Sequence, residues 1–198
     1  TRLMNEAVGI NYIDETEYPR VAVMCGRCIN MVANMWNSPE KGEWKTGAVG
    51  IGSSEACMLG GVAAWLRWRE KRKAAGKPYD KPNLVMSTAY QVVWEKFCQL
   101  WQIEMRTVPV SNQHPTLDIQ EAIRISDENT ICIVPIMGVT WTGMNDDVEA
   151  LNDALEEYNT KTGYDIPIHI DAASGGFILP FLFPEKRWDF RLKWVYSI

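Results

Sequence analysis

An aspartate with several candidate roles follows an apolar run late in the sequence, in the segment 169–176 with the letters HIDAASGG. A carboxylate at the end of a strand can bind a metal, cap a helix or pair with a cationic ring nitrogen. A metal site needs several further ligands, and the sequence has two histidines, His114 and His169; on a strand, His169 would share a face with Asp171. We therefore expect no metal. From the residues alone two interpretations of Asp171 stay open: a polar residue that ends a strand, or a residue of a functional site.

A second candidate is the turn 50–55, with the letters GIGSSE, which opens a predicted helix. The N–H groups and the positive end of the dipole at a helix start favour an anion, and Ser53 and Ser54 add two hydroxyl groups. The alternative is that one of these serines caps the helix, with Glu55 in its first turn. The turn lacks the Gly-Lys-Ser/Thr of a Walker A motif, and no strand leads into it as in a dinucleotide fingerprint.

Hydrophobic spacing predicts the elements that would position these residues. Helices are expected at 18–36, 53–75 (ended by Gly76), 91–101, 118–125 (capped by Thr116) and 147–161 (ended by Gly163). Strands are expected at 83–87, 103–108, 131–136 and 166–170, and a further one begins at 194–198. The alternation of helices with uniformly apolar strands predicts an α/β fold with a largely parallel sheet covered by helices on both faces.

Ligands of open parallel sheets bind beyond the carboxyl ends of the strands. Three segments of unusual composition follow predicted strands at that edge: Gln91, the segment 138–143 (GVTWTG) and the segment 171–176. We expect these three segments to face one crevice.

Composition and charge exclude several classes of protein. The 198 residues are 46% hydrophobic and 23% charged with a net charge of −5, which indicates a globular chain without a general nucleic-acid role. No apolar run approaches the ~20 residues of a membrane-spanning helix, and the first residues lack the apolar region of a secretory signal. Five scattered cysteines favour a reduced, cytoplasmic setting.

The pair Cys25 and Cys28 has the CxxC spacing of redox motifs. Redox pairs usually lie at the start of a helix that follows a strand. This pair falls inside the apolar pattern of the helix 18–36, so we interpret it as part of a buried face.

Eight short segments together resemble the pyridoxal-phosphate-dependent decarboxylases of the aspartate-aminotransferase fold type (fold type I). Within them the chain is most similar to the bacterial, plant and fungal branch that acts on L-glutamate. The segments are GSSEACMLGG (52–61), GKP with KPN (76–78 and 81–83), QVVWEKF (91–97), DENT (127–130), GVT (138–140), HIDAASGGF (169–177) and WDFRL (188–192). They run in fixed order along nearly the whole chain, and the SGGF continuation distinguishes this branch from aromatic amino-acid and histidine decarboxylases.

The resemblance implies a role for each candidate residue. Asp171 would pair with the pyridinium nitrogen of the cofactor and keep it protonated, so that the ring can accept the electrons left by departing carbon dioxide. The remaining implied cofactor contacts are Ser53 and Ser54 with the phosphate, Gln91 on one face of the pyridine ring, Thr140, and Ala173 packed against the ring.

The chain departs from the family pattern at three places. Gly50 stands where threonine is usual before the Gly-Ser-Ser turn, Ala89-Tyr90 is an atypical pair before Gln91, and Val93 replaces a frequent cysteine. None of the lysines matches the Schiff-base lysine, which the family places a few residues beyond the position of Ile198.

These features predict part of a large cofactor-binding domain, with an N-terminal segment and helix at 1–45 and a sheet-helix core at 46–198. The family also implies homodimers or larger homo-oligomers; the nine tryptophans fit either such contacts or an ordinary core. Two other functions stay open: a related carbon–carbon lyase that uses the same cofactor, or a non-catalytic homologue that acts as a binding or dimerisation module.

The purified 198-residue chain should release no carbon dioxide from L-glutamate, because the lysine that tethers the cofactor is not among its residues. Release of labelled carbon dioxide from carboxyl-labelled glutamate measures this, and turnover above a protein-free blank would contradict it.

Overall fold

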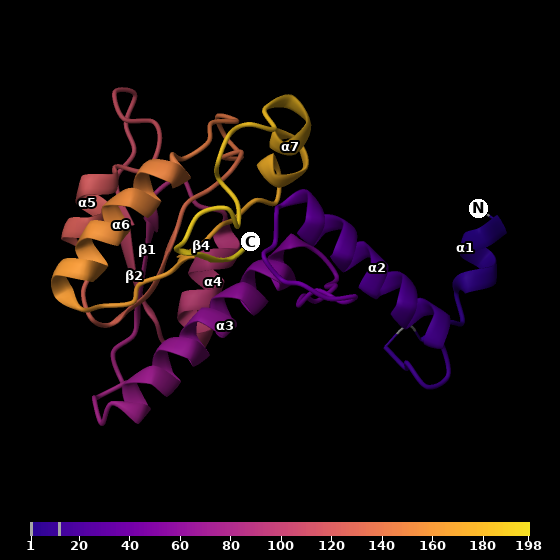
Figure 1. Cartoon of the computed structure of the whole chain (residues 1–198). Coiled ribbons are helices and arrows are strands. Elements are labelled where there is room, and N and C mark those ends of the chain that lie inside the picture. Colours follow the sequence, from indigo (N-terminus) through magenta and orange to yellow (C-terminus); the bar gives the residue numbers. More distant parts are fainter. Residues whose placement is uncertain (1, 12) are drawn as a thin grey trace. The chain divides into compact units, whose positions relative to one another are not determined.

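The computed structural model describes residues 2–11 and 13–198, which divide into two compact units. The first unit ends at Val49, and the second is Gly50–Ile198. Figure 1 shows the sheet and its covering helices in the second unit. None of the described helices is long and apolar enough to cross a membrane.

The first unit consists of α1 (Arg2–Ala7), α2 (Pro19–Met35) and the loop that follows them. Proline at the first position of α2 suits a helix start, where its missing N–H is not needed. The side chain of Asn30 ties the loop to α2, since its amide donates to the Glu43 carbonyl at 2.5 Å and accepts the Lys45 N–H at 2.8 Å. The predicted helix at 18–36 is confirmed.

The prediction of a buried face around the CxxC pair is wrong. Cys28 is exposed, Cys25 is half-buried, and the neighbouring Met24 and Met31 are 55% and 68% exposed. Within its unit, α2 is approached by the loop, whose Trp44 ring packs against Gly26, and this contact leaves the apolar side chains uncovered. Both cysteines are free thiols, and they lie in the middle of α2 rather than at its start.

The second unit is built on a five-stranded sheet in the order β2-β1-β3-β4-β5, with every neighbouring pair parallel. The strands are β1 (Asn83–Ser87), β2 (Glu104–Val108), β3 (Thr130–Val134), β4 (Ile168–His169) and β5 (Val195–Ser197). All residues of β1 and β3 are buried, as expected for central strands covered on both faces. The predicted parallel α/β fold is confirmed.

Helices cover both faces of this sheet (Figure 1). On one face lie α3 (Ser53–Ala74) and α4 (Val92–Trp101), and on the other α5 (Ile119–Arg124) and α6 (Val148–Thr162). Gly163 ends α6 in the left-handed conformation, as its position predicted. The cap of α5 differs from the prediction: Asp118, not Thr116, accepts the Glu121 N–H at 3.1 Å.

The sheet is shorter and its surroundings more helical than predicted at the carboxyl end of the sequence. β4 has two residues instead of the expected 166–170, since Pro167 has no N–H to donate and the chain beyond His169 continues as a single bridge between Asp171 and Ile136. The apolar stretch after it forms two short helices, η1 (Gly175–Phe177) and α7 (Leu179–Leu182).

Replacement of Gly60 by alanine should destabilise the protein. A Cβ there would lie 2.2 Å from Cε1 of His169, a buried ring that cannot move aside easily. Alanine in a helix interior normally gains about 1 kcal/mol over glycine; here overpacking of about 1–3 kcal/mol should reverse that sign. Urea unfolding measures the change, and Gly9→Ala, whose Cβ meets nothing within 4 Å, is the control. An unchanged or increased stability of Gly60→Ala would contradict the expectation.

Candidate cofactor site

The start of α3 presents N–H and hydroxyl groups that are not used for side-chain capping. The N-cap position is Gly52, so neither Ser53 nor Ser54 caps the helix as the alternative interpretation required. Glu55 instead reaches back to accept the Ile51 N–H at 2.5 Å, which holds the turn closed. The first N–H groups of α3 and both serine hydroxyls are therefore available to an anion such as a phosphate.

The departure at Gly50 has a local explanation in the same turn. A Cβ at Gly50 would lie 2.7 Å from Oε2 of Glu55, so the glycine leaves room for this carboxylate. A threonine at this position would require the end of the Glu55 side chain to shift.

Asp171 lies directly beyond β4 and is 6% exposed. Its Oδ2 accepts the indole N–H of Trp94 at 2.8 Å, and Cys57 lines the same cavity as the carboxylate. Its Oδ1 accepts one long hydrogen bond, from the Ala173 N–H at 3.4 Å. The carboxylate is thus held by Trp94 on α4, and Oδ1 retains most of its capacity to accept a hydrogen bond from a further donor.

Gln91 is held in place by the helix that it precedes. It is the N-cap of α4, where its Oε1 accepts the Val93 N–H at 2.8 Å. Glutamine is not among the preferred N-cap residues. The cap fixes the carboxamide at the carboxyl end of β1 and leaves its NH2 group free of this bond.

The two loops after β3 and β4 meet backbone against backbone. Gly138 has a positive φ of 84°, and a Cβ there would lie 2.9 Å from the Gly175 nitrogen. The Gly175 N–H donates to the Met137 carbonyl at 2.8 Å. Glycine at both positions therefore allows the approach that brings Thr140 and Ala173 to the same side of the sheet.

These segments surround a cavity of about 40 Å³. Five of the six predicted site residues line it; Ser54 adjoins Ser53 at its edge but is not part of the lining. The predicted lining residues are Ser53, Gln91, Thr140, Asp171 and Ala173. Ligand pockets usually enclose about 300–1,000 Å³, so this cavity is too small to hold a whole ligand. We therefore treat the residues that line it as one wall of a site. The three segments expected at one crevice do come together.

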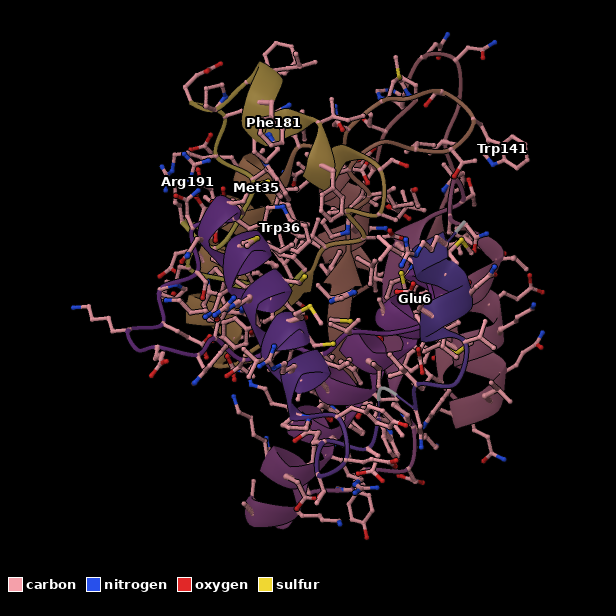
Figure 2. The ribbon with its side chains drawn as sticks, turned by 90° about the vertical axis from the view of Figure 1, so that its right-hand side faces the viewer. Glu6, Met35, Trp36, Trp141, Phe181 and Arg191 are labelled. Carbon is pink, nitrogen blue, oxygen red and sulfur yellow. The ribbon has the colours of Figure 1, made fainter. Side chains whose placement is uncertain are left out.

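Two further residues complete this wall that were not among the predicted site residues. Cys57 lines the cavity together with Asp171, and Ser174 lines it beside Ala173. Cys57 lies four residues after Ser53 on α3, a spacing that places both on one helix face and could have indicated it. Trp141, by contrast, extends into solvent at 81% exposure, although it belongs to the predicted segment 138–143 (Figure 2).

His169 lies behind Asp171 and is fully enclosed. Its Nδ1 is 2.7 Å from Oγ of Ser197, and its ring packs edge-on against Trp94 with the centroids 5.3 Å apart. Burial lowers the pKa of His169 to about 4, although the nearby charge of Asp171 acts in the opposite direction. A buried neutral imidazole in this position packs behind the wall. The described residues contain no cluster of side chains that could hold a metal ion.

A larger cavity of about 210 Å³ lies at the opposite edge of the sheet. It is lined by residues near the amino ends of β3 and β4, including Thr130 and Pro167, and by the basic face of α3. None of the predicted site residues borders it.

Three features make the wall suited to an elongated group with an anion at one end and a protonated ring nitrogen at the other. The first N–H groups of α3 have no side-chain cap, and Oδ1 of Asp171 accepts only a long hydrogen bond among the described residues. The small side chain of Ala173 leaves space between them. These are the demands of pyridoxal 5'-phosphate, so the residues present fit this cofactor.

Comparison with known proteins agrees with this site. The family model described as the pyridoxal-dependent decarboxylase conserved domain matches residues 1–198, so the chain belongs to the pyridoxal-dependent decarboxylase family, whose cofactor is pyridoxal phosphate. The family resemblance inferred from the sequence is confirmed.

Individual relatives are similar over the whole chain. Identity is 50% to "Glutamate decarboxylase beta" of Listeria monocytogenes and 48% to "Glutamate decarboxylase 1" of Arabidopsis thaliana, with 100% of this chain covered in both. The solved structure of a Lactobacillus brevis glutamate decarboxylase superposes with a TM-score of 0.92 at 47% identity, covering 98% of this chain and 44% of that one. The chain spans 43% and 39% of the lengths of the two curated relatives.

The lowered pKa of His169 predicts a pH-dependent stability. Below its ordinary pKa of 6.5 the unfolded chain binds a proton at this residue, whereas the folded chain does so only near pH 4. The free energy of unfolding should therefore fall as the pH drops from 6.5 to 4, by an amount on the order of 3 kcal/mol.

Comparison of the wild type with His169→Asn by urea unfolding at several pH values tests this. The variant should lose less stability than the wild type across this window, and measurements at pH 8 supply the reference for the packing cost of the substitution. Parallel pH profiles of the two proteins would contradict the assignment.

Proposed function

We propose that the protein containing this chain converts L-glutamate to 4-aminobutyrate and carbon dioxide with pyridoxal 5'-phosphate as cofactor. The observation that supports this most strongly is the identity of about 50%, over the full chain, to relatives named glutamate decarboxylase. The wall around Asp171 adds independent physical support, since it offers one group for each end of the cofactor.

The proposed roles of the residues are those that the family resemblance implies, and their positions in the wall support them. When bound, the cofactor supplies a ring that accepts the electron pair left by the departing carboxylate. Asp171 holds a proton at the ring nitrogen, which makes the ring a stronger electron acceptor, and its buried position strengthens that charge pair. Ser53 and Ser54, with the first N–H groups of α3, bind the phosphate.

The remaining wall residues would orient the ring. Gln91, fixed by its capping bond, would cover one face, and the small side chain of Ala173 would permit close packing on the ring. Thr140 contributes a hydroxyl contact at the rim of the same cavity.

The proposal extends to assembly and location. The parent protein is a homodimer or larger homo-oligomer in the cytoplasm. Exposed apolar side chains on α2, including Met24 and Met31, and on α7, including Phe181 (Figure 2), are surfaces that such contacts would cover.

In the complete protein, Asp171→Asn should reduce decarboxylation of glutamate by at least about 100-fold, because the amide keeps the shape of the side chain but lacks the charge that holds the nitrogen proton. Carbon dioxide and 4-aminobutyrate are measured together. Asp118→Asn is the control, since asparagine caps α5 as well as aspartate does.

The same assay separates the competing functions. An aldehyde product without carbon dioxide would identify a carbon–carbon lyase, and cofactor binding without turnover of any amino acid would identify a non-catalytic homologue. Either result with the wild-type protein would overturn the proposed activity.

A further inference from the structure

The hydrogen bonds to Asp171 are distributed unequally over its two oxygens. Oδ2 accepts the Trp94 indole N–H at 2.8 Å, a short bond between buried groups, while the donor to Oδ1 among the described residues, the Ala173 N–H, is 3.4 Å away. A carboxylate held by one strong donor on one oxygen has a fixed orientation, and the other oxygen is the better acceptor for a further donor.

The Trp94 N–H cannot turn away from this bond. Trp94 is fully buried in the core, and its ring lies edge-on to both Phe97, at a centroid distance of 6.0 Å, and His169, at 5.3 Å. Aromatic neighbours on two sides fix the indole plane, and therefore fix the direction of its N–H. The rigidity of the core is passed to the carboxylate through this one bond.

Cys57 is a second neighbour of the carboxylate, from a different helix. Its side chain lines the same cavity as Asp171, and burial together with the charge of that carboxylate raises the pKa of the thiol to about 12. The group is thus a protonated donor rather than a thiolate nucleophile. Trp94 on α4 and Cys57 on α3 approach Asp171 from the helices that cover this face of the sheet.

We propose that Trp94 and Cys57 are positioning residues of the cofactor site, which occupy one side of the Asp171 carboxylate so that Oδ1 is presented to the ring nitrogen of pyridoxal phosphate. This inference rests on the proposed function for the identity of the cofactor. It assigns to an apparently ordinary core tryptophan and to a buried cysteine the task of orienting the group that holds the nitrogen proton.

A purely structural tryptophan would behave differently on substitution. Trp68 provides the comparison within the chain: it is also buried, and its indole N–H also makes one hydrogen bond, to the Glu128 carbonyl at 3.1 Å, but it does not line the cofactor cavity. Trp94→Phe and Trp68→Phe remove the same N–H and keep an aromatic ring.

The experiment uses the complete protein, freed of cofactor and titrated with pyridoxal phosphate. Trp94→Phe should bind pyridoxal phosphate at least about 10-fold more weakly than the wild type, the size expected for loss of a hydrogen bond to a charged group. It should also shift the absorption band of the bound cofactor and lower kcat more than it raises KM. Trp68→Phe should lower Tm, while its cofactor affinity stays within about twofold of the wild type.

A second pair of variants tests the thiol with a smaller change in volume. Cys57→Ser retains a hydroxyl donor and Cys57→Ala does not, so the serine variant should bind the cofactor more tightly than the alanine variant. This pair decides the question if Trp94→Phe fails to fold. Equal cofactor affinity and equal absorption spectra in the serine and alanine variants, or a Trp94→Phe protein indistinguishable from Trp68→Phe, would overturn the proposal.

The outcome is separable from that of the proposed activity. A wild-type protein that binds pyridoxal phosphate but leaves glutamate unchanged would refute the activity, and the affinities and spectra would still test the positioning role. A wild-type protein that does not bind pyridoxal phosphate would refute both.

Discussion

The close approach of α3 to the sheet and to α4 fixes the relative positions of most groups in the site. Gly60 faces the His169 ring and Gly61 faces the Phe97 ring, at distances of 2.2 and 2.7 Å from where a Cβ would stand. Any larger side chain would push the helix outward and carry Ser53 and Cys57 away from Asp171. The anion site at the start of α3 and the carboxylate beyond β4 are therefore held at a set spacing by two missing side chains, and this spacing has to match the length of the cofactor.

The two titratable side chains next to Asp171 are both uncharged near pH 7. His169 is neutral near pH 7 because its pKa is lowered to about 4, and Cys57 is protonated because its pKa is raised to about 12. Both consequences come mainly from burial. Asp146 shows the contrasting case of a buried carboxylate: both of its oxygens accept backbone N–H groups, from Leu117 at 2.8 Å and Ile136 at 2.7 Å, and burial raises its pKa. Both oxygens of Asp146 thus accept short hydrogen bonds from the backbone, whereas Oδ1 of Asp171 accepts only a long one and lies beside a cavity.

The sequence could predict features that depend on local spacing, but not contacts between residues far apart in the chain. Apolar runs bounded by glycine and capping residues located β1 and α6 closely, because local spacing determines such elements. The strand-end rule correctly brought Gln91 and Asp171 to one cavity. The bond between Trp94 and Asp171 joins residues 77 positions apart, and no local pattern encodes a contact of that kind. The wrong prediction that the apolar face of α2 is buried has a related cause. An apolar stripe indicates which face of a helix can pack against other residues, but not whether the rest of its unit covers that face.

The charge of the wall limits what it can recognise. Among the residues described as lining the cavity, Asp171 carries the one carboxylate, and none carries a cationic group. The others are serine, glutamine, threonine or residues without a charged side chain. A substrate with two carboxylates would find no cationic side chain in this wall to pair with. In the proposed function, Ser53 and Asp171 orient the cofactor, and the charges that recognise such a substrate come from residues outside the wall. Cofactor positioning and substrate choice must then be carried by different residues, and substitutions in this wall should alter the first before the second.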